Sequence, residues 1–184
     1  MKTRIVKDLM VSLSQYATVS EEATLYDAIL ALEKAQEAFG PARYRHRAIL
    51  VLDNKNHVVG KLGMIDVLIA LEPRYKDIGD PKVFSRSGFS TQFLKSMQER
   101  YSLWDKPLND ICSKAAELKV KSFMYTPKEG EYVREDATLD EAVHQLVVGH
   151  HQSLLVTRGE EIVGILRLTD VFHEICEMIK TCKL

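Results

Sequence analysis

The feature that most constrains the fold of this chain is an internal repeat. At an offset of 114 positions, residues 6–32 align with residues 120–146 without a gap and share ten identities in 27 positions. Chance would give about two at typical residue usage. At an offset of 104 the match resumes over two Val-Gly-x-Leu-x-x-x-Asp-Val stretches, which begin at Val59 and Val163. The chain therefore holds two copies of one folding unit, and repeat 1 carries ten extra residues.

Each copy predicts a β-α-β-β-α unit. A short β stretch precedes a Thr that is followed three residues later by an acid, Thr24 with Asp27 and Thr138 with Glu141, which is a capping-box pattern. Apolar residues at helical spacing come next, then two β-branched runs separated by a turn, then a second helix near Asp66 or Asp170. The fold class is α+β, with two tandem repeats that pack together because a unit near 60 residues covers its sheet poorly alone.

The segment between the repeats is too long for a plain connection. We divide the chain into repeat 1 (1–71), a linker with a helical arm (72–119) and repeat 2 with a C-terminal helix (120–184). Within the linker, Ser90 is a candidate helix cap, and a second short helix is expected from Pro107. An apolar stripe there either covers the module or a dimer partner, or folds back on its own core, which is the more common fate of such stripes. The stripe is formed by Phe89, Phe93, Met97, Tyr101 and Trp104.

Composition excludes several classes of protein. The 25 basic and 26 acidic residues give a formal net charge of −1, which argues against nucleic acid or an anionic membrane as a partner. No apolar run approaches the roughly 20 residues of a membrane span, and the N-terminus does not resemble a signal peptide. Three cysteines without a C-x-x-C pair are typical of a reduced, cytoplasmic protein.

The two A-T-L-x-[DE]-A helix starts and the two V-G-x-L-x-x-x-D junctions resemble the paired CBS domains of a Bateman module. The resemblance implies two repeats around a pseudo-two-fold axis, with clefts for AMP, ADP, ATP, S-adenosylmethionine or a related adenosine compound, and often a homodimer. In the family's G-x-x-[ST]-x-x-D junction, the Asp takes the ribose hydroxyls and the Ser or Thr meets phosphate. Asp66 and Asp170 match the ribose position.

This chain lacks the hydroxyl at both junctions. Gly63 stands at that place in repeat 1 and Arg167 in repeat 2, where a forked cation can bind phosphate. The resemblance also places several other residues at the clefts. Two of these, Arg45 and Arg47, form a basic cluster with Arg43 and His46. Tyr132 is equally well read as an ordinary strand tyrosine. These further candidates are Thr18, Tyr132, Arg45, Arg47, Ala48 and Ser153.

We expect a stand-alone regulatory module rather than an enzyme. The sequence has no P-loop, nucleophile elbow or H-x-x-x-H site, and the repeats and linker leave no residues for a catalytic domain. Ligand binding would draw the repeats together and change the surface that an unknown partner protein meets. The alternative is a ligand-free dimerisation or docking module, which the missing hydroxyls favour. A metal or redox switch at Cys112 and adjacent His150 and His151, which a strand would point apart, ranks last.

Overall fold

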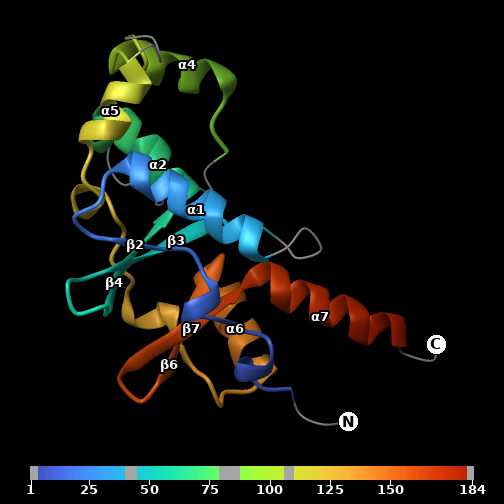
Figure 1. The fold of residues 1–184 in the computed structure, drawn as a ribbon. Coiled ribbons are helices and arrows are strands. Elements are labelled where there is room, and N and C mark those ends of the chain that lie inside the picture. Colours follow the sequence, from blue (N-terminus) through green and yellow to red (C-terminus); the bar gives the residue numbers. More distant parts are fainter. Residues whose placement is uncertain (1–3, 40–44, 79–87, 106–109, 182–184) are drawn as a thin grey trace.

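The computed structural model describes residues 4–39, 45–78, 88–105 and 110–181 of the chain. Repeat 1, coloured blue to teal in Figure 1, lies against repeat 2, coloured orange to red. Helices cover the outer faces of two small sheets. The sheets contact each other through a shared apolar core. The α+β class and the tandem repeats are confirmed.

Repeat 1 contains the three-stranded sheet and two helices. Its strands are β2 (Thr18–Ser20), β3 (Ala48–Leu52) and β4 (Val58–Gly63). Strand β2 is parallel to β3, and β3 is antiparallel to β4. Helix α1 (Leu25–Phe39) forms the crossover between the parallel strands, and α2 (Met64–Leu71) follows β4 without a loop.

Repeat 2 has the same order of elements. Its strands β5 (Tyr132–Arg134), β6 (Ser153–Arg158) and β7 (Glu161–Arg167) pair as their counterparts do. Helix α6 (Leu139–Gly149) is the crossover, and α7 (Leu168–Thr181) follows β7. Both hairpins carry a register shift at the same place, after Val51 in β3 and after Val156 in β6. The irregularity is thus a property of the unit.

Both predicted capping boxes are present. The Thr24 N–H donates to Asp27 Oδ2 at 2.9 Å, and the Asp27 N–H donates back to Thr24 Oγ1 at 3.2 Å. In repeat 2, the Thr138 N–H donates to Glu141 Oε2 at 2.8 Å, and the Glu141 N–H donates to Thr138 Oγ1 at 3.3 Å. These reciprocal bonds satisfy N–H groups that a helix start leaves without partners, so they fix where α1 and α6 begin.

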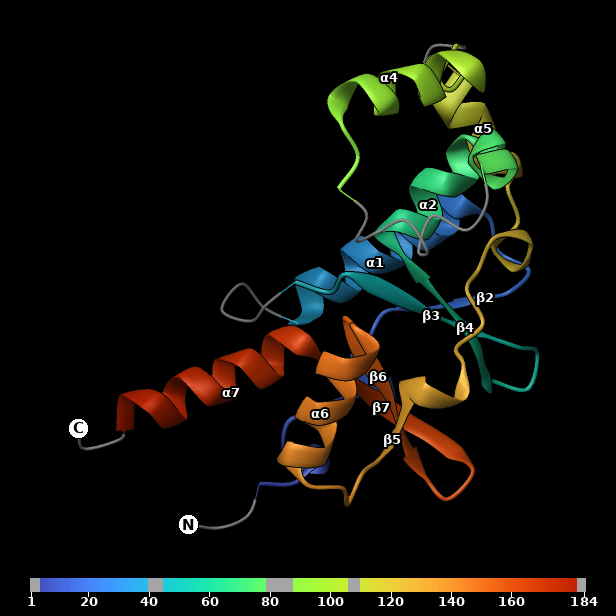
Figure 2. The ribbon, with the colours of Figure 1, turned by 180° about the vertical axis from the view of Figure 1, so that it is seen from behind.

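The segments that lead into the repeats are exchanged. We call residues 4–12 and 118–126 the two lead segments. The first contains η1 (Val6–Asp8) and β1 (Val11–Ser12), and it binds repeat 2: the Val6 N–H donates to Ala137 O, and β1 pairs antiparallel with β7. In Figure 2, seen from behind, the beginning of this segment lies beside α6.

The second lead segment binds repeat 1 through equivalent contacts. It contains η5 (Val120–Ser122), whose Val120 N–H donates to Ala23 O at 2.9 Å. The bond from Val6 to Ala137 is also 2.9 Å, and both valines are fully buried in the core of the opposite repeat. The exchange therefore follows the pseudo-two-fold relation between the repeats.

A third core joins the repeats. It is formed by buried side chains from both repeats and from the first lead segment, and the short η2 (Leu13–Gln15) lies beside it. Burying apolar area of this kind contributes about 25 cal/mol per Å². This shared core makes the pair of repeats one unit. Its fully covered members are Val11, Tyr16, Leu50, Leu155 and Ile165.

The linker projects from the far end of repeat 1. It contains η3 (Pro73–Ile78), α4 (Thr91–Arg100) and α5 (Ile111–Glu117), and a further turn, η6 (Glu129–Glu131), precedes β5. As predicted, Ser90 caps α4, since its Oγ accepts the Phe93 N–H at 3.2 Å. The helix start expected at Pro107 lies outside the described residues.

The apolar stripe of the arm is covered at one end only. Trp104 packs against a buried cluster that includes Leu71, whereas Phe93 is 45% exposed and no residue of α4 is buried. Figure 1 shows α4 arching away from the sheets. The stripe therefore does not fold back along its length on the core of its own chain.

Candidate functional site

The two strand-to-helix junctions bring the predicted acids to the start of a helix. In repeat 1, Asp66 lies in the first turn of α2, and its Oδ2 accepts the Gly63 N–H at 2.9 Å. Asp66 is half-buried, and a Cβ placed on Gly63 would meet only this carboxylate, at 3.2 Å. The repeat 1 junction thus presents a carboxylate beside backbone that carries no side chain.

The repeat 2 junction differs because Arg167 occupies the place of Gly63. Arg167 Nε and NH2 donate to Asp170 Oδ2 and Oδ1, both at 2.5 Å, which makes a bidentate ion pair. The side chain of Arg167 is 7% exposed and that of Asp170 is 18% exposed. The acid that the sequence assigns to ribose is therefore held by a cation from its own chain.

Two aromatic residues of repeat 1 contact this arginine, and a third, Tyr16, packs on one of them. Its guanidinium carbon lies 5.1 Å from the centre of the Phe39 ring, and its NH1 lies 3.3 Å from His46 Nδ1. The His46 ring packs 4.4 Å from both Phe39 and Tyr16. We call these five residues, Tyr16, Phe39, His46, Arg167 and Asp170, the cross-repeat cluster.

The electrostatics of the cluster keep His46 neutral. Burial and the neighbouring Arg167 lower the pKa of His46 to about 4, so the ring carries no charge at neutral pH. Its backbone N–H donates to Gln36 Oε1, and its Nε2 is buried without a hydrogen-bond partner among the described residues. Burial likewise raises the pKa of Tyr16 to about 12. The arginine is thus the cation of the cluster and the histidine is its neutral neighbour.

The place related to this cluster by the pseudo-two-fold is built from smaller residues. Sheet register and the repeat offset pair Tyr16 with Gly130, and Arg167 with Gly63. A Cβ placed on Gly130 would meet no atom within 4 Å. His151, the counterpart of His46, packs against Gly149 and is half-buried. The repeat 1 junction therefore has glycine at the two places where the repeat 2 junction has Arg167 and Tyr16.

The remaining predicted residues lie on the strands beside the junctions. Ala48 pairs with Gly63 at the start of β3, and the buried Ser153 pairs with Arg167 at the start of β6. Arg45 is exposed. The structure thus brings each strand start together with its own junction.

The two residues expected on the first strands are half-buried. Thr18 pairs with Leu50 in β2, and Tyr132 pairs with Leu155 in β5. Tyr132 packs against the core between the repeats. Arg47, like Arg45, is exposed beside the start of β3, and Arg43 lies outside the described residues.

The structure corrects the expected placement of the adjacent histidines. His150 is the C-cap of α6 with a left-handed backbone (φ 52°), and the His151 N–H donates to Leu146 O, so neither lies on a strand. The left-handed cap was not expected because Gly is the usual residue there. Among the described residues, no group of three or more His, Cys, Asp or Glu side chains is placed to hold a metal ion.

A polar contact between the repeats was not predicted. Lys61 Nζ and the Tyr125 hydroxyl each donate to the carboxylate of Glu131, which is 4% exposed. Burial by itself raises the pKa of Glu131, but the hydrogen bonds from Lys61, Tyr125 and the Lys128 N–H, together with the charge of Lys61, lower it. The equivalent position in the other half is the apolar pair Val11 and Ile165. The signal available in the sequence was Lys61 itself, a charged residue within the otherwise uncharged strand β4.

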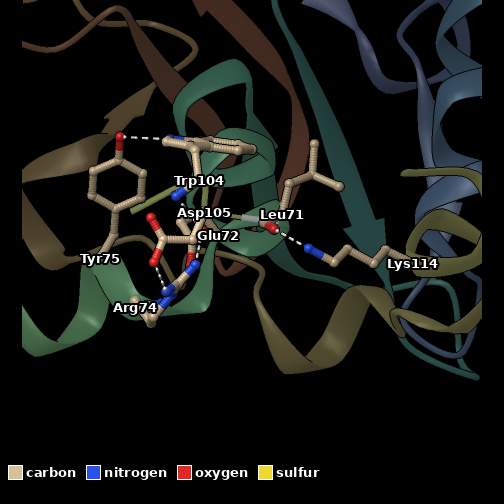
Figure 3. A network of polar contacts seen from close by, with 7 residues as sticks. All are labelled: Leu71, Glu72, Arg74, Tyr75, Trp104, Asp105 and Lys114. Atoms are coloured by element: carbon tan, nitrogen blue, oxygen red, sulfur yellow. Dashed lines mark hydrogen bonds and ion pairs between the residues drawn. The ribbon is translucent and has the colours of Figure 1, made fainter. Parts of the chain in front are cut away.

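A second polar network anchors the arm (Figure 3). Arg74 donates two hydrogen bonds to the Glu72 carboxylate, and the Trp104 N–H donates to Glu72 Oε2 at 2.8 Å. Trp104 Nε1 donates to the Tyr75 hydroxyl, and Lys114 Nζ donates to Leu71 O. The hydrogen bonds from Arg74 lower the pKa of Glu72 to about 2. The network ties both ends of the arm to the end of α2.

In the part of the chain that the structure describes, none of the helices has the length and apolar character that a bilayer crossing requires.

Comparisons with known proteins agree with this architecture. A sequence model of the CBS domain matches residues 6–73 and 120–177, which together make up more than half of the chain. No curated protein sequence matches significantly. A CBS domain-containing protein from Bacillus anthracis shares 18% identity over 95% of this chain and 94% of its own, with a TM-score of 0.59.

Two solved structures carry the name CBSX2. The CBS-pair protein CBSX2 from Arabidopsis thaliana is 16% identical over 98% of this chain and 100% of its own, with a TM-score of 0.59. A structure of CBSX2 in complex with AMP is 20% identical over 95% of this chain and 97% of its own, also with a TM-score of 0.59. At these identities the likeness shows the fold.

Proposed function

Because the chain belongs to the CBS-domain family, we propose that it is a regulatory module that binds an adenine nucleotide or a related adenosyl compound. The ligand class comprises AMP, ADP, ATP and S-adenosylmethionine. The observation that carries this proposal is the repeat 1 junction, where Asp66 stands at the start of α2 beside Gly63. The AMP bound to CBSX2 supports the choice of ligand class.

The chemistry of the repeat 1 junction suits a nucleoside. A carboxylate has about four acceptor positions, and Asp66 gives one of them to the Gly63 N–H. A ribose cis-diol needs two more. The start of α2 adds N–H groups and the positive end of the helix dipole for a phosphate. Exposed Arg45 and Arg47, beside the start of β3, supply cations for the same phosphate.

Signalling would pass through the contacts that join the two halves. Each lead segment hydrogen-bonds to the opposite repeat, so a ligand that changes the distance between repeats also moves the segments that flank them. A ligand shifts such an equilibrium only as far as it favours one state. The protein that reads this change is unknown, and we assign no catalytic step to the module itself.

We also propose that the module acts as a cytoplasmic homodimer. Helices α1 and α2 expose large apolar side chains on adjacent parts of repeat 1, and a soluble monomer seldom leaves such groups uncovered. A second copy that covers the same face would bury them. The exposed residues are Tyr26, Ile29, Leu30, Met64, Ile65 and Leu68.

One observation favours a ligand-free docking module as the alternative. Both junction acids already accept hydrogen bonds within the chain, Asp66 from Gly63 and Asp170 from Arg167. In that case the pair of repeats would serve as a constitutive dimerisation unit. It would bind none of the four compounds.

Titration calorimetry with AMP, ADP, ATP and S-adenosylmethionine tests the proposal on protein that native mass spectrometry has shown to be ligand-free. We expect heat with at least one compound and an affinity at least tenfold lower in Asp66→Asn, because two charge-assisted hydrogen bonds are weakened. Asp140→Asn, at an exposed position in the first turn of α6, is the matched control. If none of the compounds gives heat, the proposed function is wrong and the ligand-free docking module is the remaining candidate.

A further inference from the structure

We infer that Arg167 acts as an internal ligand of the repeat 2 junction, so that the chain binds one adenosine compound, at Asp66, and not two. This inference rests on the proposed function and deepens it. It begins from the difference between the junctions, where one acid faces a glycine and the other is held by a guanidinium.

The guanidinium reproduces the hydrogen bonds that a ribose would make. A cis-diol presents two neighbouring O–H donors to the two oxygens of a carboxylate. Arg167 presents Nε and NH2 to the two oxygens of Asp170 in the same way, each at 2.5 Å. A bidentate arginine occupies both oxygens of the carboxylate on the side from which a cis-diol would have to donate its two hydrogen bonds. Asp170 is therefore already bound in the manner that a nucleoside requires.

Contacts with the opposite repeat hold the arginine in place. Its guanidinium lies 5.1 Å from the Phe39 ring centre and 3.3 Å from His46 Nδ1, and its side chain is 7% exposed. A ligand at Asp170 would have to break the ion pair and these contacts with repeat 1. Desolvated ion pairs with additional partners are costly to break from one side.

Among the described residues, the related place in repeat 1 has no such internal ligand. Gly63 replaces the arginine, and Gly130 replaces the tyrosine that packs on the histidine. A Cβ on Gly130 would have no neighbour within 4 Å, and one on Gly63 would meet only Asp66. In the described part of the chain, the repeat 1 junction thus has an acid without a guanidinium partner, beside two glycines that add no side chain.

The experiment counts ligands per chain by native mass spectrometry and calorimetry for the compound that the wild type binds. We expect one ligand per chain in the wild type and two in Arg167→Ser, which supplies the hydroxyl that the junction lacks. Arg167→Gly, which copies the residue of repeat 1, provides a second test if the serine variant folds poorly. Thermal unfolding verifies that each variant is folded.

Two further variants show which acid holds each ligand. Asp170→Asn placed on Arg167→Ser should return the count from two to one, and Asp66→Asn in the wild type should lower the affinity at least tenfold. The matched control is Arg158→Ser, because Arg158 also makes a bidentate pair, with Glu135, but at an exposed position. Its count should stay at one.

The outcomes separate the inference from the proposed function. Two ligands per wild-type chain, or one per chain in both folded Arg167 variants, would overturn the inference and leave the nucleotide-binding function standing. A wild type that binds nothing while Arg167→Ser binds one ligand would overturn the assignment to Asp66. No binding by the wild type or by either Arg167 variant would overturn the proposed function itself.

Discussion

At the scale of single residues, the cross-repeat cluster decides how the repeat 2 junction behaves. A neutral histidine contacts one buried arginine and a tyrosine of raised pKa packs on that histidine, so the ion pair with Asp170 is the only charge pair at this place among the described residues. The stability of this cluster therefore depends on pH through His46. Protonation would put a second cation 3.3 Å from the guanidinium.

This placement makes His46 an acid-sensitive point. The folded chain takes up the His46 proton near pH 4 and the unfolded chain near pH 6.5, so the unfolded chain binds more protons between these values. The free energy of unfolding should therefore fall as the pH falls from 6.5 to 4. As the pH falls from 7.5 to 4.5, we expect the free energy of unfolding of His46→Phe to decrease by about 2 kcal/mol less than that of the wild type. Urea denaturation at each pH measures the difference.

His144→Gln is the control for this measurement, since His144 is exposed on α6. Its stability should follow the wild type at every pH. Parallel curves for the wild type and His46→Phe would show that His46 does not titrate as described.

Sequence reasoning reached these residues in part. The i, i+3 spacing of Arg167 and Asp170 at a helix start was visible, and it permits an ion pair. The partners from the other repeat were not visible, because His46 lies 121 positions away and no local pattern joins it to Arg167. Phe39 was missed for the same reason. A resemblance assigns roles by position and does not show which acid is already occupied.

At the scale of elements, the arm depends on one carboxylate. Glu72 is buried at the end of α2 and accepts hydrogen bonds from Arg74 and from the Trp104 backbone. Trp104 has a left-handed backbone (φ 60°), which is strained for a non-glycine residue. The contact to Glu72 compensates for this strain and fixes the turn that follows α4.

Removing the Glu72 side chain should therefore loosen the arm. We expect Glu72→Ala to lower the free energy of unfolding by about 1–3 kcal/mol, since it leaves a partly buried N–H and a guanidinium without their acceptor. The single tryptophan reports the change directly, and its fluorescence should shift to longer wavelength. Hydrogen exchange should rise in α4.

The matched control for the arm is Glu99→Ala. Glu99 makes an exposed pair with Lys95 at 4.0 Å on α4, so its removal should change stability by less than about 0.5 kcal/mol. An unshifted tryptophan spectrum in Glu72→Ala would show that the turn is held by other contacts.

Elements were more predictable than contacts. The strands and the capping boxes of both repeats follow from local pattern, and two matching copies doubled the signal. The fate of the arm's stripe did not follow, because helical spacing shows that Phe93 and Met97 share a face but not what lies opposite it. The C-cap at His150 was missed because its residue type gave no indication of a left-handed backbone.

At the scale of the whole molecule, the exchanged lead segments make the two repeats interdependent. Val6 completes the core of repeat 2 and Val120 completes the core of repeat 1. The sequence showed that these valines are equivalent, but equivalence alone fits docking on either repeat. Which repeat each segment binds depends on the tertiary arrangement, which the repeat pattern does not encode.

The exchange predicts one cooperative transition. Val6→Ala should lower the free energy of unfolding by about 1–3 kcal/mol through the lost methyl groups and the cavity they leave. Although Val6 packs in repeat 2, the Trp104 fluorescence transition at the far end of repeat 1 should shift to lower urea by the same amount as the far-ultraviolet circular dichroism. Two separated transitions would contradict this interdependence.

Val148→Ala is the control for Val6→Ala, because Val148 lies in repeat 2 but is 66% exposed. Its transition should remain within about 0.5 kcal/mol of the wild type.

The exchanged lead segments also have a consequence for a severed chain. A single cut within α4 divides the polypeptide into two fragments, and each fragment carries the lead segment whose valine belongs in the core of the other. Neither piece has a complete interior of its own. Together the two pieces hold every residue of both interiors, so we expect a chain that is cut in α4 to reassemble from its two complementary fragments.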